Sequence, residues 1–281
     1  MPTLANSVWL ISGCSTGFGR EIALAALEGG AQVAVTARNP ESVTDICERF
    51  PGQALALPLD VSSTRAVTAC VEAALTRFGR IDALVNNAGY GYVAAIEEGE
   101  EDAVRALFEV NFFGALALTR AVLPVMRRQG NGHIINNSSQ AGIMANPGTG
   151  FYSASKYALE GLMEALQKEV APLGIRVTSV QPGAFRTDWS GRSMQRSPVV
   201  IDDYAHVHER LDMIAAIDGK QPGDPVRAAQ IFVDLYTMPN PPVQLVLGAG
   251  ALATYRGKLA ELRAGLDRLE SLSTAADYPA P

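Results

Sequence analysis

The chain has 281 residues, of which 48% are hydrophobic and 19% are charged. This composition is typical of a globular protein and excludes a disordered chain or a coiled-coil fibre. The formal charge is −6, and no run of Lys or Arg is present, so nucleic acid is not expected as a partner. The ligand is expected to be small.

Cysteine usage and the N-terminal sequence predict where the protein resides. Cys14, Cys47 and Cys70 are too widely spaced for a disulfide framework or a CxxC metal site, which indicates a reducing cytoplasm and no bound metal. Residues 1–7 lack the basic segment of a signal peptide, and the longest apolar stretch, residues 114–126, is interrupted by Arg120. We therefore expect neither export nor a membrane span.

Short runs rich in Val, Ile and Leu recur along the chain and predict seven β-strands, at residues 8–12, 32–36, 54–59, 82–86, 133–138, 176–181 and 244–247. Apolar residues with helical period lie between them, at residues 18–27, 65–78, 104–126, 152–170 and 226–236. This alternation requires right-handed crossovers, and both sheet faces are then buried, which explains why the strands are apolar throughout. The predicted class is α/β: a single Rossmann-type, doubly wound, seven-stranded parallel sheet with helices on both faces.

No linker divides the first 190 residues, so residues 1–281 are expected to form a single domain. Residues 189–225 have no strong period and are expected to form an insertion that covers the substrate. A 3-4 spacing of apolar residues predicts a C-terminal amphipathic helix over about residues 251–270, with a stripe of Leu252, Tyr255, Leu259, Leu262, Leu266 and Leu269. The favoured interpretation is that this stripe docks on its own domain, and the alternative is a subunit contact.

A glycine-rich turn lies directly between the first predicted strand and the first predicted helix. It consists of Gly13, Cys14, Ser15, Thr16, Gly17, Phe18 and Gly19. Glycine permits positive φ, and it lets a pyrophosphate approach the backbone N–H groups at the positive end of the helix dipole. A tight connection alone could also use glycine, but this context predicts a dinucleotide site, in which Gly13 turns the chain, Gly17 allows contact and Gly19 permits close packing.

The end of the second predicted strand indicates which dinucleotide binds. An acidic residue there would accept hydrogen bonds from the adenosine ribose, whereas arginine accommodates a 2′-phosphate. The sequence has Arg38 and no carboxylate at this point, which favours NADP(H) over NAD(H). The alternative is that Arg38 is a plain surface residue and that Glu41 or another acid serves the ribose.

Two further strand ends carry candidate cofactor residues. Asp60 and Val61 follow the third strand, where the carboxylate can accept from the adenine amino group while the valine packs on the ring. Asp60 as a helix N-cap is an equally good interpretation and does not exclude the first. Asn87, Ala88 and Gly89 follow the fourth strand and are expected beneath the cofactor, although turn formation alone could explain them.

Hydroxyl and amine groups point to the chemistry. Ser139 follows the fifth strand, and Tyr152 and Lys156 are four residues apart on one face of the next helix. Bringing a phenol from a pKa near 10 to near 7 requires about 4 kcal/mol, and a nearby ammonium and an oxidised nicotinamide can both contribute. A lone Tyr-x-x-x-Lys pair is more often an exposed cation beside a core aromatic residue, but with Ser139 and a dinucleotide site it predicts hydride transfer at a carbon that bears oxygen.

Together these residues resemble the short-chain dehydrogenase/reductase family, in its Tyr-x-x-x-Lys branch. The matching residues cover about residues 8–190 in order and comprise the segment from Ser12 to Gly19, Asp60, Val61, Asn86, Asn87, Ala88, Gly89, Asn111, Ser139, Tyr152, Lys156, Pro182, Gly183 and Thr187. The sequence as a whole, including its longer C-terminal part, resembles the subgroup of 17β-hydroxysteroid and retinol dehydrogenases over most of the chain, and this resemblance does not specify the substrate.

The resemblance implies a role for each matched side chain. Tyr152 would be the general acid/base, and Lys156 would lower the pKa of Tyr152 and hold the nicotinamide ribose. Ser139 would orient the carbonyl, and Asn111 would help to hold a water in a proton relay. Pro182, Gly183 and Thr187 would contact the nicotinamide side, and the family's helices equivalent to residues 104–126 and 152–170 imply a homodimer or homotetramer.

Some positions depart from the family pattern. Ser12 replaces the usual threonine and keeps its hydroxyl. Asn137 fills a usually apolar position, and strand alternation predicts that it points to the same side as Ser139. It either makes a supporting hydrogen bond or is a simple polar replacement. No second basic residue lies within residues 14–16, so the NADP(H) prediction depends on Arg38 alone.

The expected substrate is a bulky apolar ketone or secondary alcohol. The residues near the strand ends that favour it are Tyr90, Tyr92, Ile143, Met144, Phe151, Phe185, Trp189 and Met194, although half of them could equally be ordinary core. One alternative is a 3-oxoacyl thioester reductase, but no basic docking patch is visible. Another is a non-catalytic NADP(H)-binding regulatory protein, which would be expected to have lost the catalytic residues that are intact here.

Overall fold

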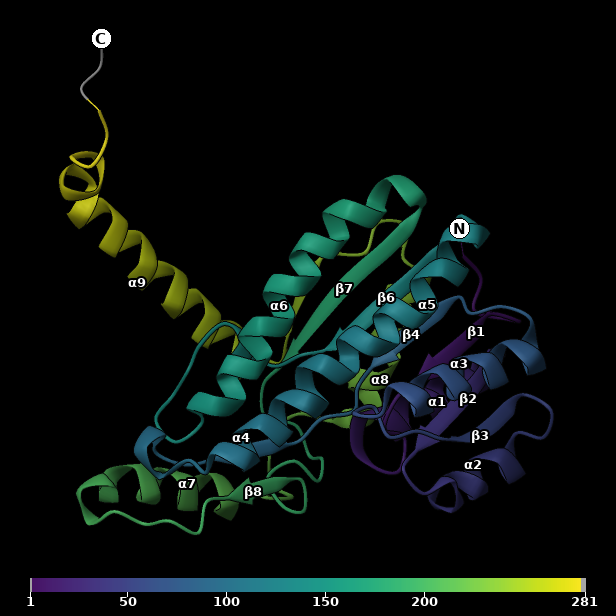
Figure 1. The fold of residues 1–281 in the computed structure, drawn as a ribbon, viewed down its shortest axis with the longest axis horizontal. Helices are drawn as coiled ribbons and strands as arrows, with labels where there is room; N and C mark the ends of the chain where they lie inside the picture. The colour runs from purple at the N-terminus through teal and green to yellow at the C-terminus, as the bar shows by residue number, and fades with distance from the viewer. Residues whose placement is uncertain (1, 279–281) are drawn as a thin grey trace.

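Seven parallel strands form the central sheet of the computed structural model, which describes residues 2–278 (Figure 1). In chain order the strands are β1 (Val8–Ile11), β2 (Gln32–Ala37), β3 (Ala54–Pro58), β4 (Ala83–Asn86), β6 (Gly132–Asn137), β7 (Ile175–Pro182) and β9 (Gln244–Leu247). Their spatial order is β3-β2-β1-β4-β6-β7-β9, so the winding direction reverses between β1 and β4. Ligands of open sheets bind beyond the carboxyl ends of the strands at such a reversal. The predicted fold class is confirmed.

Helices cover both faces of this sheet. The first face packs against α1 (Gly17–Glu28), α2 (Thr44–Arg49) and α8 (Pro225–Thr237), and the second against α3 (Thr64–Phe78), α5 (Ala115–Gln129) and α6 (Gly150–Val170). Side chains alternate between the two cores along β1, where Trp9 and Ile11 join the first cluster and Leu10 joins the second. Both faces are therefore apolar, as the continuous hydrophobic runs predicted.

A single long helical stretch precedes β6. It consists of α4 (Glu101–Phe108), a π-helical segment (Glu109–Gly114) and α5. Within residues 2–278, Glu101–Gln129 is the one helix long and apolar enough to cross a membrane, with a mean hydropathy of 1.5. Its buried side chains, such as Leu118 and Met126, pack in the second core cluster of the fold. The stretch is therefore no clear membrane span.

The insertion between β7 and α8 contains regular structure that the sequence did not predict. β8 (Met194–Arg196) pairs in parallel with the short strand β5 (Gly91–Val93), and α7 (Ala205–Ala216) follows it. The apolar face of α7 is narrow, because its buried residues are Val207 and Leu211. These two residues pack against Val93 and Ala95, which attaches the insertion to the segment after β4.

The C-terminal helix α9 (Ala249–Thr274) projects away from the sheet and its flanking helices (Figure 1). Its apolar stripe is exposed, with Leu259 52% and Leu266 72% accessible. The favoured interpretation, that the stripe docks on its own domain, is therefore wrong for the described residues. Both sheet faces are already covered by other helices, and Gly248, with φ +100°, starts α9 in a direction away from them.

A buried carboxylate anchors the insertion. Glu98 is 2% exposed and accepts hydrogen bonds from the Ala95 and Ile201 N–H groups and from His208 Nε2, the last at 2.7 Å. Burial alone would raise the pKa of Glu98, but these hydrogen bonds from Ile201, His208 and Ala95 hold it below its usual value. This anchor is fully present above the unfolded carboxyl pKa, near 4.3, and is lost as the pH falls through the lower folded pKa.

Replacement of Glu98 by Gln should loosen the insertion by about 1–3 kcal/mol, because a buried charged acceptor of several donors is lost. Hydrogen exchange at neutral pH should show faster exchange in α7 and little change in the central sheet. Glu101→Gln is the matched control, because Glu101 is exposed and pairs only with Arg105 on its own helix. Equal exchange of α7 in Glu98→Gln and wild type would contradict the anchoring role.

Candidate active site

The glycine turn at the start of α1 forms an open cradle. Gly13 and Gly17 have φ of +73° and +59°, a backbone conformation that favours glycine. A Cβ on Gly19 would collide with the Gly13 carbonyl oxygen and Asn87 Nδ2, so Gly19 permits close packing. Thr16, the N-cap of α1, makes no side-chain capping bond, so the first N–H groups of the helix remain available to an acceptor. This arrangement fits a pyrophosphate.

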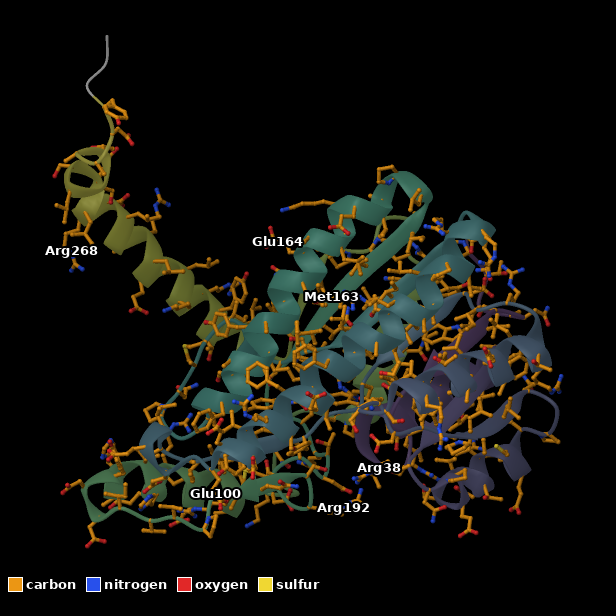
Figure 2. The ribbon with its side chains drawn as sticks, viewed as in Figure 1. Arg38, Glu100, Met163, Glu164, Arg192 and Arg268 are labelled. Carbon is orange, nitrogen blue, oxygen red and sulfur yellow. The ribbon has the colours of Figure 1, made fainter. Side chains whose placement is uncertain are left out.

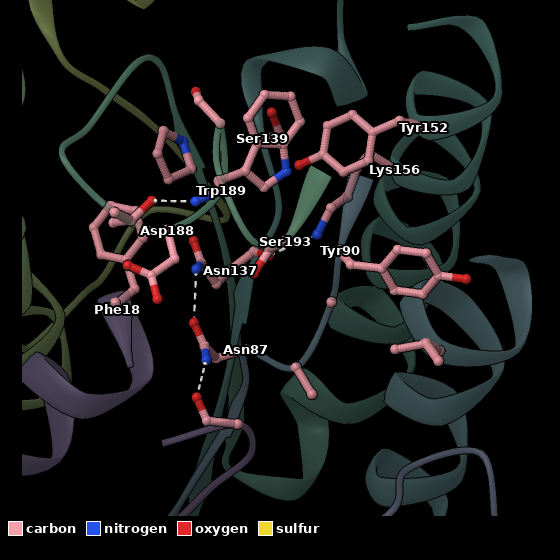
Figure 3. Close-up of a pocket in the computed structure, with 18 of the residues that line it drawn as sticks. Phe18, Asn87, Tyr90, Asn137, Ser139, Tyr152, Lys156, Asp188, Trp189 and Ser193 are labelled. Carbon is pink, nitrogen blue, oxygen red and sulfur yellow. Dashed lines mark hydrogen bonds between the residues drawn. The ribbon is translucent and has the colours of Figure 1, made fainter. Parts of the chain in front are cut away.

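A cavity of about 1020 Å³ extends from this turn along the carboxyl ends of the strands (Figure 3). The predicted site residues that line it are Gly13, Ser15, Thr16, Gly17, Phe18, Arg38, Asp60, Val61, Asn87, Ala88, Gly89, Ser139, Tyr152, Lys156, Pro182, Gly183 and Thr187. Gly19 and Asn111 do not line it. The cavity therefore brings together the turn, the strand ends and the Tyr-x-x-x-Lys helix.

Hydrogen bonds connect the glycine turn to Lys156 across three strand ends (Figure 3). Asn87 Nδ2 donates to the carbonyl oxygens of Ser12 at 2.9 Å and Gly13 at 3.0 Å. Asn137 Nδ2 donates to Asn87 Oδ1 at 2.9 Å, and Lys156 Nζ donates to the Asn137 carbonyl oxygen at 3.0 Å. The Ser12 hydroxyl also accepts from the N–H groups of Asn87 and Ala88. The parts of the site thus hold one another in place.

Asn137 takes part in this series of hydrogen bonds, which decides between a supporting role and a simple polar replacement. Its side chain lines the same cavity as Ser139, as strand alternation predicted. Because its amide supports Asn87 and its carbonyl oxygen holds Lys156, it is more than a polar replacement at the strand end.

Arg38 and Asp60 lie at the far end of the cavity from Tyr152. Asp60 Oδ1 accepts from the N–H and hydroxyl of Ser62, and these bonds hold the pKa of Asp60 below its usual value. Asp60 does not cap α3, because the N-cap is Ser63, so that interpretation is wrong. Among the described residues Arg38 is exposed and has no hydrogen-bond or ion-pair partner, which leaves its guanidinium free for a ligand.

Sequence reasoning missed Arg192, which is labelled in Figure 2, lies in the insertion and reaches the glycine turn. Its Nη2 donates to Thr16 Oγ1 at 2.8 Å across 176 residues of sequence, and it also pairs with Asp188 at 3.1 Å. Arg192 and Arg38 line the same cavity. No local pattern could have revealed this second cation, because its approach depends on how the insertion folds.

Tyr152 lies inside the cavity wall at the start of α6. Its side chain is 7% exposed, and its ring packs 5.2 Å from the Trp189 ring (Figure 3). Gly91 leaves space for this indole, because a Cβ at Gly91 would lie 3.0 Å from it. Lys156 Nζ lies 5.8 Å from the centre of the Tyr152 ring. A buried phenol, a hydroxyl and an ammonium therefore face one cavity.

Burial dominates the electrostatics of this pair. It raises the pKa of Tyr152 to about 12, although interactions with Ser139 and Trp189 act in the opposite direction. It also lowers the pKa of Lys156 to about 8, against the raising effect of the Glu160 carboxylate. Removal of water thus disfavours the phenolate more than its neighbours favour it, and the lowering of the Tyr152 pKa by Lys156 stays a prediction.

Asn111 lies behind the cavity, in the π-helical segment between α4 and α5. Its Oδ1 accepts from the Tyr90 N–H, and its Nδ2 donates to the Tyr90 carbonyl oxygen and to Ser155 Oγ. These contacts fix the segment that carries Gly89 and Tyr90 against α6. The relay water expected at Asn111 stays a prediction.

Of the eight apolar residues that favoured a bulky substrate, four line the cavity, three pack in separate hydrophobic clusters and Ile143 does neither. Tyr90, Met144, Phe185 and Trp189 line the cavity. Tyr92 and Phe151 pack together in a separate core cluster, with ring centres 6.0 Å apart. Met194 packs beneath α7, and Ile143 accepts a hydrogen bond from Tyr157 through its carbonyl oxygen. The cavity near Tyr152 is aromatic, but less so than the sequence indicated.

Curated relatives are oxidoreductases. An oxidoreductase of Botryotinia fuckeliana is 38% identical over 275 residues, which cover 96% of this chain and 99% of that protein. A 3-ketodihydrosphingosine reductase of Bacteroides thetaiotaomicron is 37% identical over 240 residues, which cover 85% of this chain and 87% of that protein.

Solved structures share the fold. A short-chain dehydrogenase from Streptomyces avermitilis has a TM-score of 0.92 and 40% identity, over 98% of this chain and 100% of that one. A short chain dehydrogenase from Burkholderia cenocepacia, in complex with NADP, has a TM-score of 0.75 and 26% identity, over 95% of this chain and 99% of that one. The family model for short chain dehydrogenases matches residues 7–197. The chain thus belongs to the short-chain dehydrogenase/reductase family and is an oxidoreductase that acts on a CH–OH or carbonyl group with a nicotinamide cofactor.

Proposed function

We propose that the protein transfers a hydride between NADP(H) and a bulky, largely apolar ketone or secondary alcohol. The observation that carries this proposal is the burial of Tyr152 beside Ser139 and Lys156, in one cavity with the glycine turn. We further propose that the chain acts as a single domain, with residues 189–225 covering the substrate. The cytoplasmic location stays a prediction.

Tyr152 and the side chains around it would each have a separate role in carbonyl reduction. Bound NADP(H) supplies the hydride and, when oxidised, a positive charge near the phenol. Tyr152 Oη would donate its proton to the substrate oxygen in reduction and accept one in oxidation. The Ser139 hydroxyl would hydrogen-bond the same oxygen as negative charge develops there. Lys156 uses one N–H on Asn137, and its other two would hold the nicotinamide ribose.

Two arginines support the preference for NADP(H). Arg38 has no partner among the described residues, and Arg192 reaches Thr16 at the mouth of the pyrophosphate cradle. Guanidinium groups bind phosphate through paired, charge-assisted hydrogen bonds. Solved family members are in complex either with NADP or with NAD or NADH, so the preference for NADP(H) depends on these arginines. Glu41, the alternative ribose acceptor, does not line the cavity.

The aromatic cavity wall and one relative support a bulky ketone. Tyr90, Phe185 and Trp189 provide apolar surface around Tyr152. The Bacteroides relative is named for a reductase of a long-chain ketone, 3-ketodihydrosphingosine. The alternative, a 3-oxoacyl thioester, has weaker support, because the solved 3-ketoacyl-(acyl-carrier-protein) reductase from Brucella melitensis is 25% identical to this chain whereas the Bacteroides relative is 37% identical.

The exposed stripe of α9 supports a homo-oligomer. Leu252, Leu259 and Leu266 recur every seven residues, and Tyr255, Leu262 and Leu269 follow each of them by three. This is the spacing of a helix that packs along a second helix. We propose that α9 of a second copy covers the stripe, in addition to the family's usual contact helices.

Replacement of Tyr152 by Phe should lower kcat about 100- to 10,000-fold, because the proton donor is lost while the ring remains. NADP(H) binding should change little. The matched control is Tyr157→Phe on the same helix, which removes a hydroxyl outside the cavity that hydrogen-bonds the Ile143 carbonyl oxygen, and this variant should retain wild-type turnover. Wild-type turnover by Tyr152→Phe would eliminate the proposed proton transfer.

Replacement of Arg38 by Ala should weaken NADP binding roughly tenfold or more and leave NAD binding nearly unchanged, because the 2′-phosphate loses a charged partner. Calorimetric titration with each cofactor measures the ratio of the NADP affinity to the NAD affinity. Arg49→Ala serves as the control, since Arg49 pairs with Glu28 away from the cavity. An unchanged NADP to NAD ratio would contradict the role of Arg38.

The double variant Leu259→Asp, Leu266→Asp should weaken self-association about 100-fold or more, because two apolar side chains at the contact become charged. Light scattering at several protein concentrations reports the assembly. Asp267→Ser on the polar face of α9 is the control. A wild-type monomer at every concentration would refute the oligomer, and an unchanged oligomer in the double variant would exclude α9 from its interface.

A further inference from the structure

Arg210 of α7 is a cation without a partner in the wall of the cavity. Its side chain lines the cavity, and its Nη1 atom is buried without a hydrogen bond. No described residue forms an ion pair with it. A guanidinium group carries five N–H donors, and a buried donor left unpaired is unfavourable. The Arg210 guanidinium can therefore donate to an acceptor that is not among the described residues.

The packing of α7 places Arg210 over the segment that leads to Tyr152. Leu211 and Val207, beside Arg210 on the helix, are the side chains that a Cβ on Gly148 would meet first, at 2.8 and 3.1 Å. Gly148 lies just before α6, the helix that carries Tyr152. Ile214 and Ile217, one and two turns after Arg210, line the same cavity. This part of the wall is separate from Arg38 at the end of β2.

Neighbouring charges do not neutralise Arg210. Two nearby side chains of the insertion already have partners, because Arg196 pairs with Asp212 and His208 Nε2 hydrogen-bonds Glu98. The acidic side chains that line the cavity are Asp60, Glu109 and Asp188, and none of them pairs with Arg210. Arg210 is half-buried, and its buried Nη1 donor is stabilised when an acceptor faces it.

We propose that Arg210 binds an oxyanion on the substrate, of which a carboxylate is the simplest, while the carbonyl faces Tyr152. The substrate class is then a ketone or secondary alcohol with an apolar body and a second, anionic end. This inference rests on the proposed function and narrows its substrate. Planar paired donors suit a carboxylate, and the adjacent Ile214 and Ile217 suit the apolar body.

A series of keto acids of increasing chain length, each with its methyl ester, tests this subsite. With NADPH, the wild type should show at least about tenfold higher kcat/KM for the best acid than for its ester, mainly through KM. Arg210→Met should bring that ratio close to one, and Arg210→Lys should keep part of it. Arg196→Met, which removes a paired cation outside the cavity, should leave the ratio at the wild-type value.

Equal acid to ester ratios in wild type and Arg210→Met would overturn the inference. Calorimetric binding of the same acids and esters to the enzyme with NADP⁺ separates this failure from failure of the proposed function. Arg210-dependent binding of acids without turnover of any carbonyl would retain the anion subsite and refute the redox proposal. Turnover with no preference for acids in either measurement would refute the subsite alone.

Discussion

A chain of hydrogen bonds across the carboxyl ends of β1, β4 and β6 is the constraint on which the site depends. It runs from the Gly13 carbonyl through the amides of Asn87 and Asn137 to Lys156. Parallel strands in register bring these residues to the carboxyl edge of the sheet. There each residue provides a hydrogen-bond partner for a polar group of the next in a partly buried place. The glycine turn and the helix that carries Tyr152 are therefore held in a fixed relation through these strand ends.

The burial that orders the site also disfavours the charged forms of Tyr152 and Lys156. Burial raises the pKa of Tyr152 to about 12 and lowers that of Lys156 to about 8, so each group is moved toward its neutral form. A phenol in this state is a proton donor that resists ionisation. Its ionised form would become accessible when more positive charge arrives beside it, which would link proton release at Tyr152 to occupation of the dinucleotide cradle.

Local patterns predicted most of this fold and site. The apolar runs predicted all seven strands of the sheet, and the glycine turn and the pair Tyr152 and Lys156 were evident because their spacing follows one strand end or one helix face. Features set by distant contacts were missed. Arg192 meets Thr16 only after the insertion folds, α7 has too narrow an apolar face to reveal itself, and the direction of α9 is set by Gly248. The pKa of Tyr152 also required knowledge of its burial.

The ionisation of Tyr152 can be observed directly from tyrosinate absorbance, as the difference between wild type and Tyr152→Phe across a pH titration. Without nucleotide, Tyr152 should remain protonated throughout the range in which an ordinary tyrosine, with a pKa near 10, ionises. With NADP⁺ bound, the same group should ionise at clearly lower pH. An ordinary pKa in the free protein, or the same pKa with and without NADP⁺, would contradict the control of this phenol by burial and added positive charge.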